Sequence, residues 1–287
     1  MIMDFLITPF SSNAFLLNAL LAGMLVSIAC GIVGTFVVLR GLAFIGDALA
    51  HGVLPGVAIA MLLGLPGMLG AAVGALGMIF GIGFITRRSN LSSDTAIGLL
   101  FVGMLALGVA IVSRSHAFSG DLVRILFGEI LGIRTSELVI QLVATLVIAA
   151  LAVVCYRPFL LLCFSPEQAE VSGFSPRRYH AIMLVMIALT VVVSFRTVGT
   201  LLVFGMLLAP AASAALFSRK ITTMVLTASG IGACSVYLGL LASYHYNIAA
   251  GAAITLAASA LFFGLLTIKQ LLPAPRARHG ASQGAAS

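Results

Sequence analysis

Long apolar runs, each about the length of a membrane span, follow one another along almost the whole chain. Short polar stretches separate nine of them, at roughly 14–39, 42–64, 66–86, 95–113, 136–156, 181–195, 197–217, 221–243 and 248–268. A helix needs about 20 apolar residues to cross a bilayer, and every backbone polar group must then be satisfied within the protein. We therefore predict an all-α integral membrane protein, a polytopic bundle of eight or nine transmembrane helices. The uncertain division is at Arg196, where two short runs meet at a single charge.

The composition agrees with a lipid environment rather than a water-facing surface. Only 8% of the residues are charged and 61% are hydrophobic, whereas soluble domains carry about 25% charged residues. The net charge of +7 does not indicate a nucleic-acid partner, because the basic residues are spread over alternate loops. With nine spans, eleven of the fifteen Lys and Arg residues fall on one side. The positive-inside rule makes that side cytoplasmic and places the N-terminus outside.

Three segments outside the spans have features of their own. Residues 121–132 carry apolar side chains on one helical face, which predicts a short amphipathic helix at the outer interface. The longest cytoplasmic loop runs from Arg157 to His180 and contains Ser165-Pro166-Glu167-Gln168, a pattern typical of a helix start with proline in the first turn. We expect residues 1–268 to form the membrane domain and residues 269–287 to form a disordered cytoplasmic tail.

The second span holds an acid and a histidine at helical spacing. Asp47 and His51 are four residues apart, so they lie on one face of a helix, near the middle of the bilayer. A carboxylate at that depth has to face a cavity or a partner, and the pair suits Zn²⁺, Mn²⁺ or Fe²⁺. The same spacing equally fits two side chains that only hydrogen-bond to each other and to neighbouring helices. Pro55, one turn later, indicates a hinge, and so does Pro210 in the 197–217 run.

Other candidate site residues and motifs are fewer. His245, in an aromatic cluster expected in an outer loop, is a weaker candidate for metal entry. The chain has no phosphate-binding loop of the GxxxxGK[ST] type, no HExxH and no GxSxG. We therefore predict that the chain is not an enzyme, and that any ATP hydrolysis belongs to a partner.

Four blocks of the sequence resemble the permease subunits of zinc/manganese/iron-type ATP-binding-cassette importers. They are Leu39–Ala60, Leu126–Leu131, Ser165–His180 and Ser194–Ala214. The resemblance implies a multi-pass permease of the bacterial inner membrane that works as a homodimer, with a cytoplasmic ATPase and an extracytoplasmic metal-binding protein. It also implies that Asp47 and His51 are metal ligands on the pathway. The loop holding Ser165, Pro166, Glu167, Gln168 and Gly173 would dock the ATPase.

Two departures from the family pattern stand out. Ser165 stands where the coupling segment usually has Asp, and His245 stands where the last outer loop often has a second Tyr. We expect Zn²⁺ to be favoured over Mn²⁺ or Fe²⁺ as the transported ion. The rival interpretations are an ATP-independent secondary transporter or channel, and a permease for metal chelates such as siderophores or vitamin B12. A chelate permease would not need a narrow Asp–His pair, whereas a neighbouring gene for a phosphate-loop ATPase would favour the importer over a secondary transporter or channel.

Overall fold

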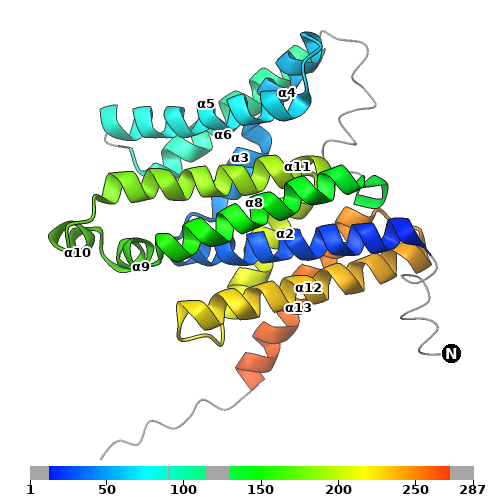
Figure 1. The fold of residues 1–287 in the computed structure, drawn as a ribbon. Coiled ribbons are helices and arrows are strands. Elements are labelled where there is room, and N and C mark those ends of the chain that lie inside the picture. Colours follow the sequence, from blue (N-terminus) through cyan, green and yellow to red (C-terminus); the bar gives the residue numbers. More distant parts are fainter. Residues whose placement is uncertain (1–12, 90, 114–129, 272–287) are drawn as a thin grey trace, which may run out of the picture.

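The computed structural model describes residues 13–89, 91–113 and 130–271, and this part of the chain is helical (Figure 1). The helices are α2 (Ala14–Leu39), α3 (Ala43–Gly52), α4 (Leu54–Leu62), α5 (Gly67–Arg88), α6 (Ser93–Ser113), the 3₁₀ turn η1 (Ile130–Gly132), α8 (Thr135–Val154), α9 (Tyr156–Phe164), α10 (Pro166–Val171), α11 (Pro176–Ala215), α12 (Ile221–Tyr246) and α13 (Ala250–Leu271). Nine stretches of the described residues are long and apolar enough to cross a membrane. This confirms the predicted fold class. Residues 121–129 of the predicted outer amphipathic helix and residues 272–287 of the predicted tail lie outside the described residues.

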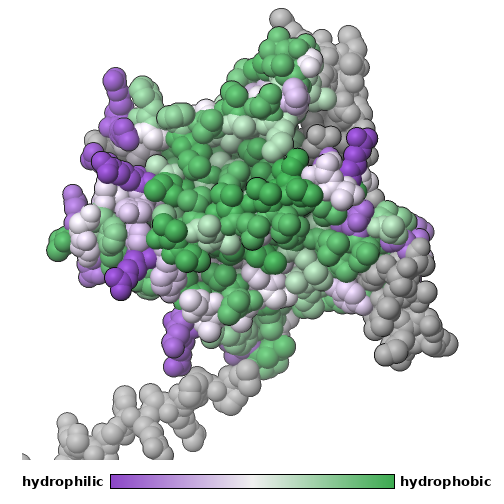
Figure 2. Space-filling view, in the orientation of Figure 1, coloured by the Kyte–Doolittle hydropathy of each residue, from purple (hydrophilic) through white to green (hydrophobic). Residues whose placement is uncertain are grey.

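The spans form a bundle with polar ends. Hydrophobic side chains cover the middle of the molecule, and hydrophilic ones gather at both ends (Figure 2). Helices α9 and α10 lie at one end, together with the C-terminal end of α2, and the N-terminal end of α2 lies at the other (Figure 1). We call the α9–α10 end the inner end, because most Lys and Arg residues are expected there.

Helix α2 is the centre of the bundle and packs against α8, α11 and α12. Its glycines allow this close packing. A Cβ at Gly31 would lie 2.8 Å from the backbone nitrogen of Ser229 in α12, and a Cβ at Gly34 would lie 3.1 Å from the carbonyl carbon of Leu207 in α11. Small residues at helix crossings let backbones approach and increase van der Waals contact, which drives helix association in lipid. Helices α4, α5 and α6 form a second group beside this centre (Figure 1).

Helix α11 is two spans joined by a sharp turn. Its only residue with non-helical backbone angles is Gly199 (φ 77°, ψ 165°). Both ends of α11 lie at the inner end of α2. His180 is 3.4 Å from Arg40, and Ala211 and Ala214 pack with Val38 and Leu39. The chain therefore reverses at Gly199, which confirms the division near Arg196 and the count of nine spans in the described residues.

The turn of α11 is enclosed by protein. Phe195, Val198 and Thr200 are all buried, although turns usually lie at the surface. Irregular backbone at membrane depth is tolerated where protein covers it, and the position of Gly199 meets that condition. The backbone angles of Gly199 fall in a region that is open essentially to glycine alone.

Candidate metal pair and inner docking segment

Asp47 and His51 lie one turn apart in α3, as their spacing predicts. The Nε2 atom of His51 is 3.4 Å from the Oδ1 atom of Asp47. The His51 side chain is 22% exposed and the Asp47 side chain is 29% exposed. The pair is therefore neither sealed in the core of the chain nor fully open. A partly exposed carboxylate inside a membrane span has to face a cavity or another protein chain, because lipid would leave its charge unpaired.

One ring nitrogen of His51 is left without a hydrogen-bond partner. Its Nδ1 atom is buried and has no hydrogen-bond partner. The ring of Phe101 in α6 packs edge-on against the imidazole at 5.6 Å between ring centroids. The Sδ atom of Met78 in α5 is 2.5 Å from where a Cβ would lie at the neighbouring Gly52. Buried polar atoms without partners are uncommon in folded proteins, and functional sites are one place where they occur.

A break in the helix follows the pair immediately. Helix α3 ends at Gly52 and α4 begins at Leu54, with Val53 between them. Pro55 has no N–H, so the His51 carbonyl loses the donor that residue i+4 normally supplies. At Pro210 the backbone of α11 is helical, and the non-helical residue of α11 is Gly199. The hinge roles of Pro55 and Pro210 stay predictions.

One chain supplies a small set of metal ligands. Among the described residues, no group of three or more His, Cys, Asp or Glu side chains could hold a metal ion. His245 lies in the last turn of α12, not in a loop as expected, and its ring contacts Tyr244 at 5.3 Å between centroids. Helix α12 runs to Tyr246, because hydrogen bonding continues past its last strongly apolar residue and ends at Asn247 in a left-handed conformation.

The predicted helix start at Ser165-Pro166 is confirmed. Ser165 is the N-cap of α10, and its Oγ atom accepts a hydrogen bond from the Gln168 amide at 3.3 Å, while Pro166 occupies the first turn. The helix ends in a Schellman motif. Gly173 has a positive φ of 82°, its N–H donates to the Glu170 carbonyl (3.0 Å), and the Phe174 N–H donates to the Ala169 carbonyl (2.9 Å). Local sequence therefore fixes both ends of this short helix.

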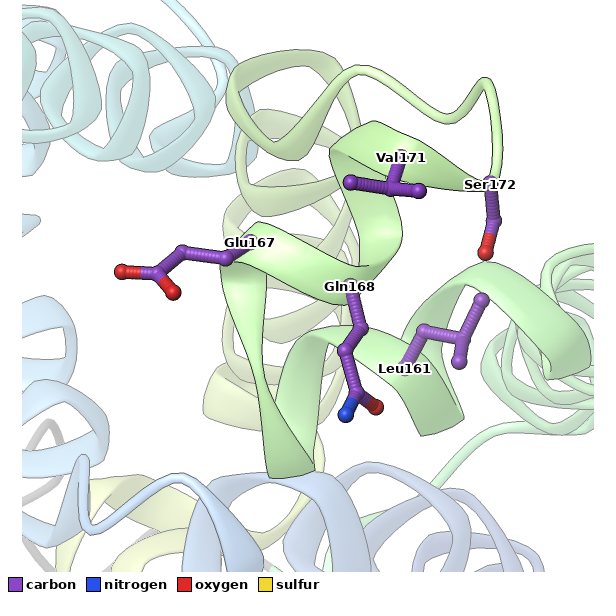
Figure 3. Close-up of a pocket in the computed structure, with 5 residues that line it drawn as sticks. All are labelled: Leu161, Glu167, Gln168, Val171 and Ser172. Atoms are coloured by element: carbon purple, nitrogen blue, oxygen red, sulfur yellow. The ribbon is translucent and has the colours of Figure 1, made fainter.

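A shallow pocket of about 400 Å³ lies between α9 and α10 (Figure 3). Its lining residues are Leu161, Glu167, Gln168, Val171 and Ser172. Figure 3 shows Glu167 pointing away from the other four side chains. Val171 is 91% exposed and Phe164 is 73% exposed, although neither belongs to a membrane span. Exposed large apolar side chains outside the membrane spans are typical of a protein contact surface. We call residues 156–173 the docking segment.

The docking segment is tied to α2 by a residue that the sequence analysis did not single out. Arg40, just after α2, donates a hydrogen bond to the carbonyl of Leu162 in α9. Cys163 lies next to this contact. Burial raises the pKa of the Cys163 thiol to about 11, and the positive charge of Arg40 offsets part of that rise. The sequence signal for this contact is Pro166, which has no N–H to donate to the Leu162 carbonyl four residues earlier.

Comparison with known proteins gives consistent matches over most of the chain. Residues 12–269 match the model of the ABC 3 transport family. The chain is 39% identical over 249 residues to the manganese transport system membrane protein MntC of Listeria innocua, covering 87% of this chain and 89% of the relative. It is 36% identical to a protein of Haemophilus influenzae named "Probable iron transport system membrane protein", covering 90% and 95% of the two chains.

A solved structure has the same architecture. PsaBC from Streptococcus pneumoniae, in complex with Fab, contains a chain that superposes with a TM-score of 0.82 at 36% identity. The match covers 93% of this chain and 95% of that chain.

Proposed function

This chain belongs to the ABC 3 transport family, and we propose that it is the membrane-spanning permease subunit of an ATP-driven importer of divalent transition metal ions. The observation that carries the proposal is the Asp47–His51 pair. It combines a carboxylate, an imidazole with an unpartnered Nδ1 atom, and partial exposure, all within a membrane span. A pair that served only the packing of one chain would be expected to bury and satisfy its polar atoms.

Two copies of the chain would complete the metal site. Two ligands are too few for a closed tetrahedral site, whereas a homodimer with α3 at a central pathway would present Asp47 and His51 twice. Two carboxylates would neutralise a divalent ion, which reduces the cost of holding it at low dielectric. Transport needs a site that also releases its ion, and a pair near a helix break at Val53 offers a means of changing its geometry.

The names of the relatives support manganese as the transported ion. The sequence alone favoured Zn²⁺, and imidazole with carboxylate accepts Zn²⁺, Mn²⁺ and Fe²⁺. The names of the Listeria innocua and Haemophilus influenzae relatives refer to manganese and iron. We therefore propose Mn²⁺ as the preferred ion, with Fe²⁺ next.

The docking segment is the proposed contact with a cytoplasmic ATP-binding-cassette ATPase. It lies at the inner end, carries the exposed Phe164 and Val171, and has the pocket beside Gln168. ATP would bind only to that partner. At the outer end an extracytoplasmic metal-binding protein would deliver the ion, and His245 in the last turn of α12 lies within reach of that surface. The bilayer concerned is the bacterial inner membrane.

The experiment is metal uptake by the permease, its ATPase and its binding protein in sealed proteoliposomes. We expect Mn²⁺ to enter only when ATP is supplied to the ATPase side, and to be displaced more readily by Fe²⁺ than by Zn²⁺. Equal uptake without ATP would show a channel or secondary transporter. Uptake that occurs only when the metal is presented as a chelate would show a chelate permease.

A further inference from the structure

Pro166 creates an unsatisfied backbone acceptor at the inner end of the molecule. The last carbonyls of a helix lack intrahelical donors unless the chain continues to supply them. Leu162 lies in the last turn of α9, and its i+4 residue is Pro166, which has no N–H. The Leu161 carbonyl, by contrast, accepts from the Ser165 amide at 2.9 Å. The start of α10 thus leaves the Leu162 carbonyl without a backbone donor.

Arg40 supplies the missing donor from 122 residues away. Its Nη1 atom donates to the Leu162 carbonyl at 2.5 Å, and its Nη2 atom is 3.4 Å from Nδ1 of His180 in the first turns of α11. The carbonyl end of a helix carries partial negative charge, so a cation is favoured there. Among the described residues, the polar contacts of Arg40 are with this carbonyl and this imidazole, and neither is a carboxylate. The guanidinium therefore bridges α9 and α11 through neutral acceptors.

Apolar packing reinforces the same junction. One turn before Arg40, the ring of Phe36 packs edge-on against Phe159 of α9, with 5.2 Å between centroids. Both rings are almost fully buried. The docking segment is thus held to the end of α2 by one aromatic contact and one charged hydrogen bond.

The same junction is adjacent to the candidate metal pair in the sequence. Arg40, Gly41 and Leu42 form the three-residue connection between α2 and α3, with Gly41 at a positive φ of 65°. Asp47 follows seven residues after Arg40, in the second turn of α3. A force on the docking segment can therefore reach the start of α3 through Arg40 without passing through a flexible loop.

We propose that Arg40 is the positioning residue that transmits movement of the docking segment to the span carrying Asp47 and His51. This inference rests on the proposed function, in which an ATPase moves the docking segment. Arg40 touches neither metal nor ATP. It couples them because its two-pronged guanidinium holds α9 and α11 at once, which a single ammonium cannot do.

The test compares metal transported with ATP hydrolysed in the same proteoliposomes holding the full complex. In Arg40→Gln the charged hydrogen bond to Leu162 is lost, and we expect Mn²⁺ uptake per ATP to fall about tenfold. Assembly with the ATPase and the rate of hydrolysis should stay within about twofold of the values for the unmodified complex. A twofold change is smaller than the effect expected from losing even a weak neutral hydrogen bond. Arg40→Lys, which keeps the charge, should lose less. Arg219→Gln is the matched control, because Arg219 is an exposed cation in the loop between α11 and α12; its uptake per ATP should not change.

Each other result counts against the proposal. An unchanged ratio of Mn²⁺ uptake to ATP hydrolysis in assembled Arg40→Gln would overturn the role of Arg40. This includes the case in which uptake and hydrolysis fall in proportion, which is what a purely structural residue produces. If Arg40→Gln fails to assemble, Arg40→Lys decides by the same ratio, and a normal value overturns the role. Failure of the unmodified complex to take up metal with ATP would overturn the proposed function itself, and with it this inference.

Discussion

Replacing Gly56 with alanine should separate α4 from α5, because the two backbones touch at that point. A Cβ at Gly56 would overlap the carbonyl oxygen of Gly70 and would lie 3.0 Å from both the Gly70 carbonyl carbon and the Gly74 nitrogen. These are backbone atoms, so no side-chain rotation can relieve the overlap. The helices would have to move apart by roughly 1 Å to restore ordinary contact distances of about 3.5–4 Å.

The expected cost follows from the packing. Forcing an extra methyl group into a well-packed core costs about 1–3 kcal/mol, and the rigid neighbours at Gly56 place it at the upper end. For a chain of this size each kcal/mol lowers Tm by about 2–4 °C, so Tm should fall by roughly 6–12 °C. The change also bears on the candidate site, because Gly56 follows Pro55 and a Cβ at Gly74 would lie 3.0 Å from Val53 at the helix break.

The assay is thermal unfolding of the purified permease in detergent, with Gly77→Ala as the matched control. Gly77 is also in α5, but a Cβ there would have nothing within 4 Å. Alanine is a better helix former than glycine by about 1 kcal/mol, so Gly77→Ala should keep or raise Tm. Equal Tm values for Gly56→Ala and Gly77→Ala would refute the reasoning, since they would show that the α4–α5 contact does not limit stability.

Two further substitutions or measurements test other parts of the structure. Gly199→Ala forces a side chain into backbone angles that only glycine adopts freely, so it should lower the free energy of unfolding by about 1–3 kcal/mol. The control is Gly264→Ala, in a regular and open part of α13, which should not lower it. Equal unfolding temperatures for the two variants would argue against a turn at Gly199. The second test uses a variant that keeps Cys163 as its only cysteine. Burial raises the pKa of the Cys163 thiol to about 11, which leaves about one thiol in a thousand ionised at pH 8. Maleimide labelling should therefore be slow, and it should accelerate with rising pH. Fast labelling at pH 7 would contradict the burial of that thiol.

The spans could be predicted from the sequence because lipid imposes a minimum apolar length on each one. Two local features could also be predicted from the sequence, because each depends only on neighbours within one helical turn. They are the Asp47–His51 spacing and the Ser165-Pro166 cap. His245 was misplaced in a loop because hydropathy declines before the helix does, and α12 continues to Tyr246.

Contacts between distant segments were beyond this kind of reasoning. Arg40 and Leu162 are 122 residues apart, and only the proline four residues after Leu162 hinted that its carbonyl needed an outside donor. The buried turn at Gly199 was visible as a doubtful boundary between two spans, but its enclosure depends on how α11 packs against the other helices of the bundle.

Metal uptake by Asp47→Asn tests the central claim most directly. Asparagine keeps the shape of the side chain and can still hydrogen-bond to His51, but it removes the charge that a divalent ion needs at low dielectric. Uptake of Mn²⁺ is measured in proteoliposomes and normalised to the amount of assembled complex, with His51→Ala in parallel. If the pair binds metal on the pathway, both variants assemble and both lose uptake. Near-normal uptake by Asp47→Asn would show that the pair is only structural, and the assignment of the metal site would be wrong.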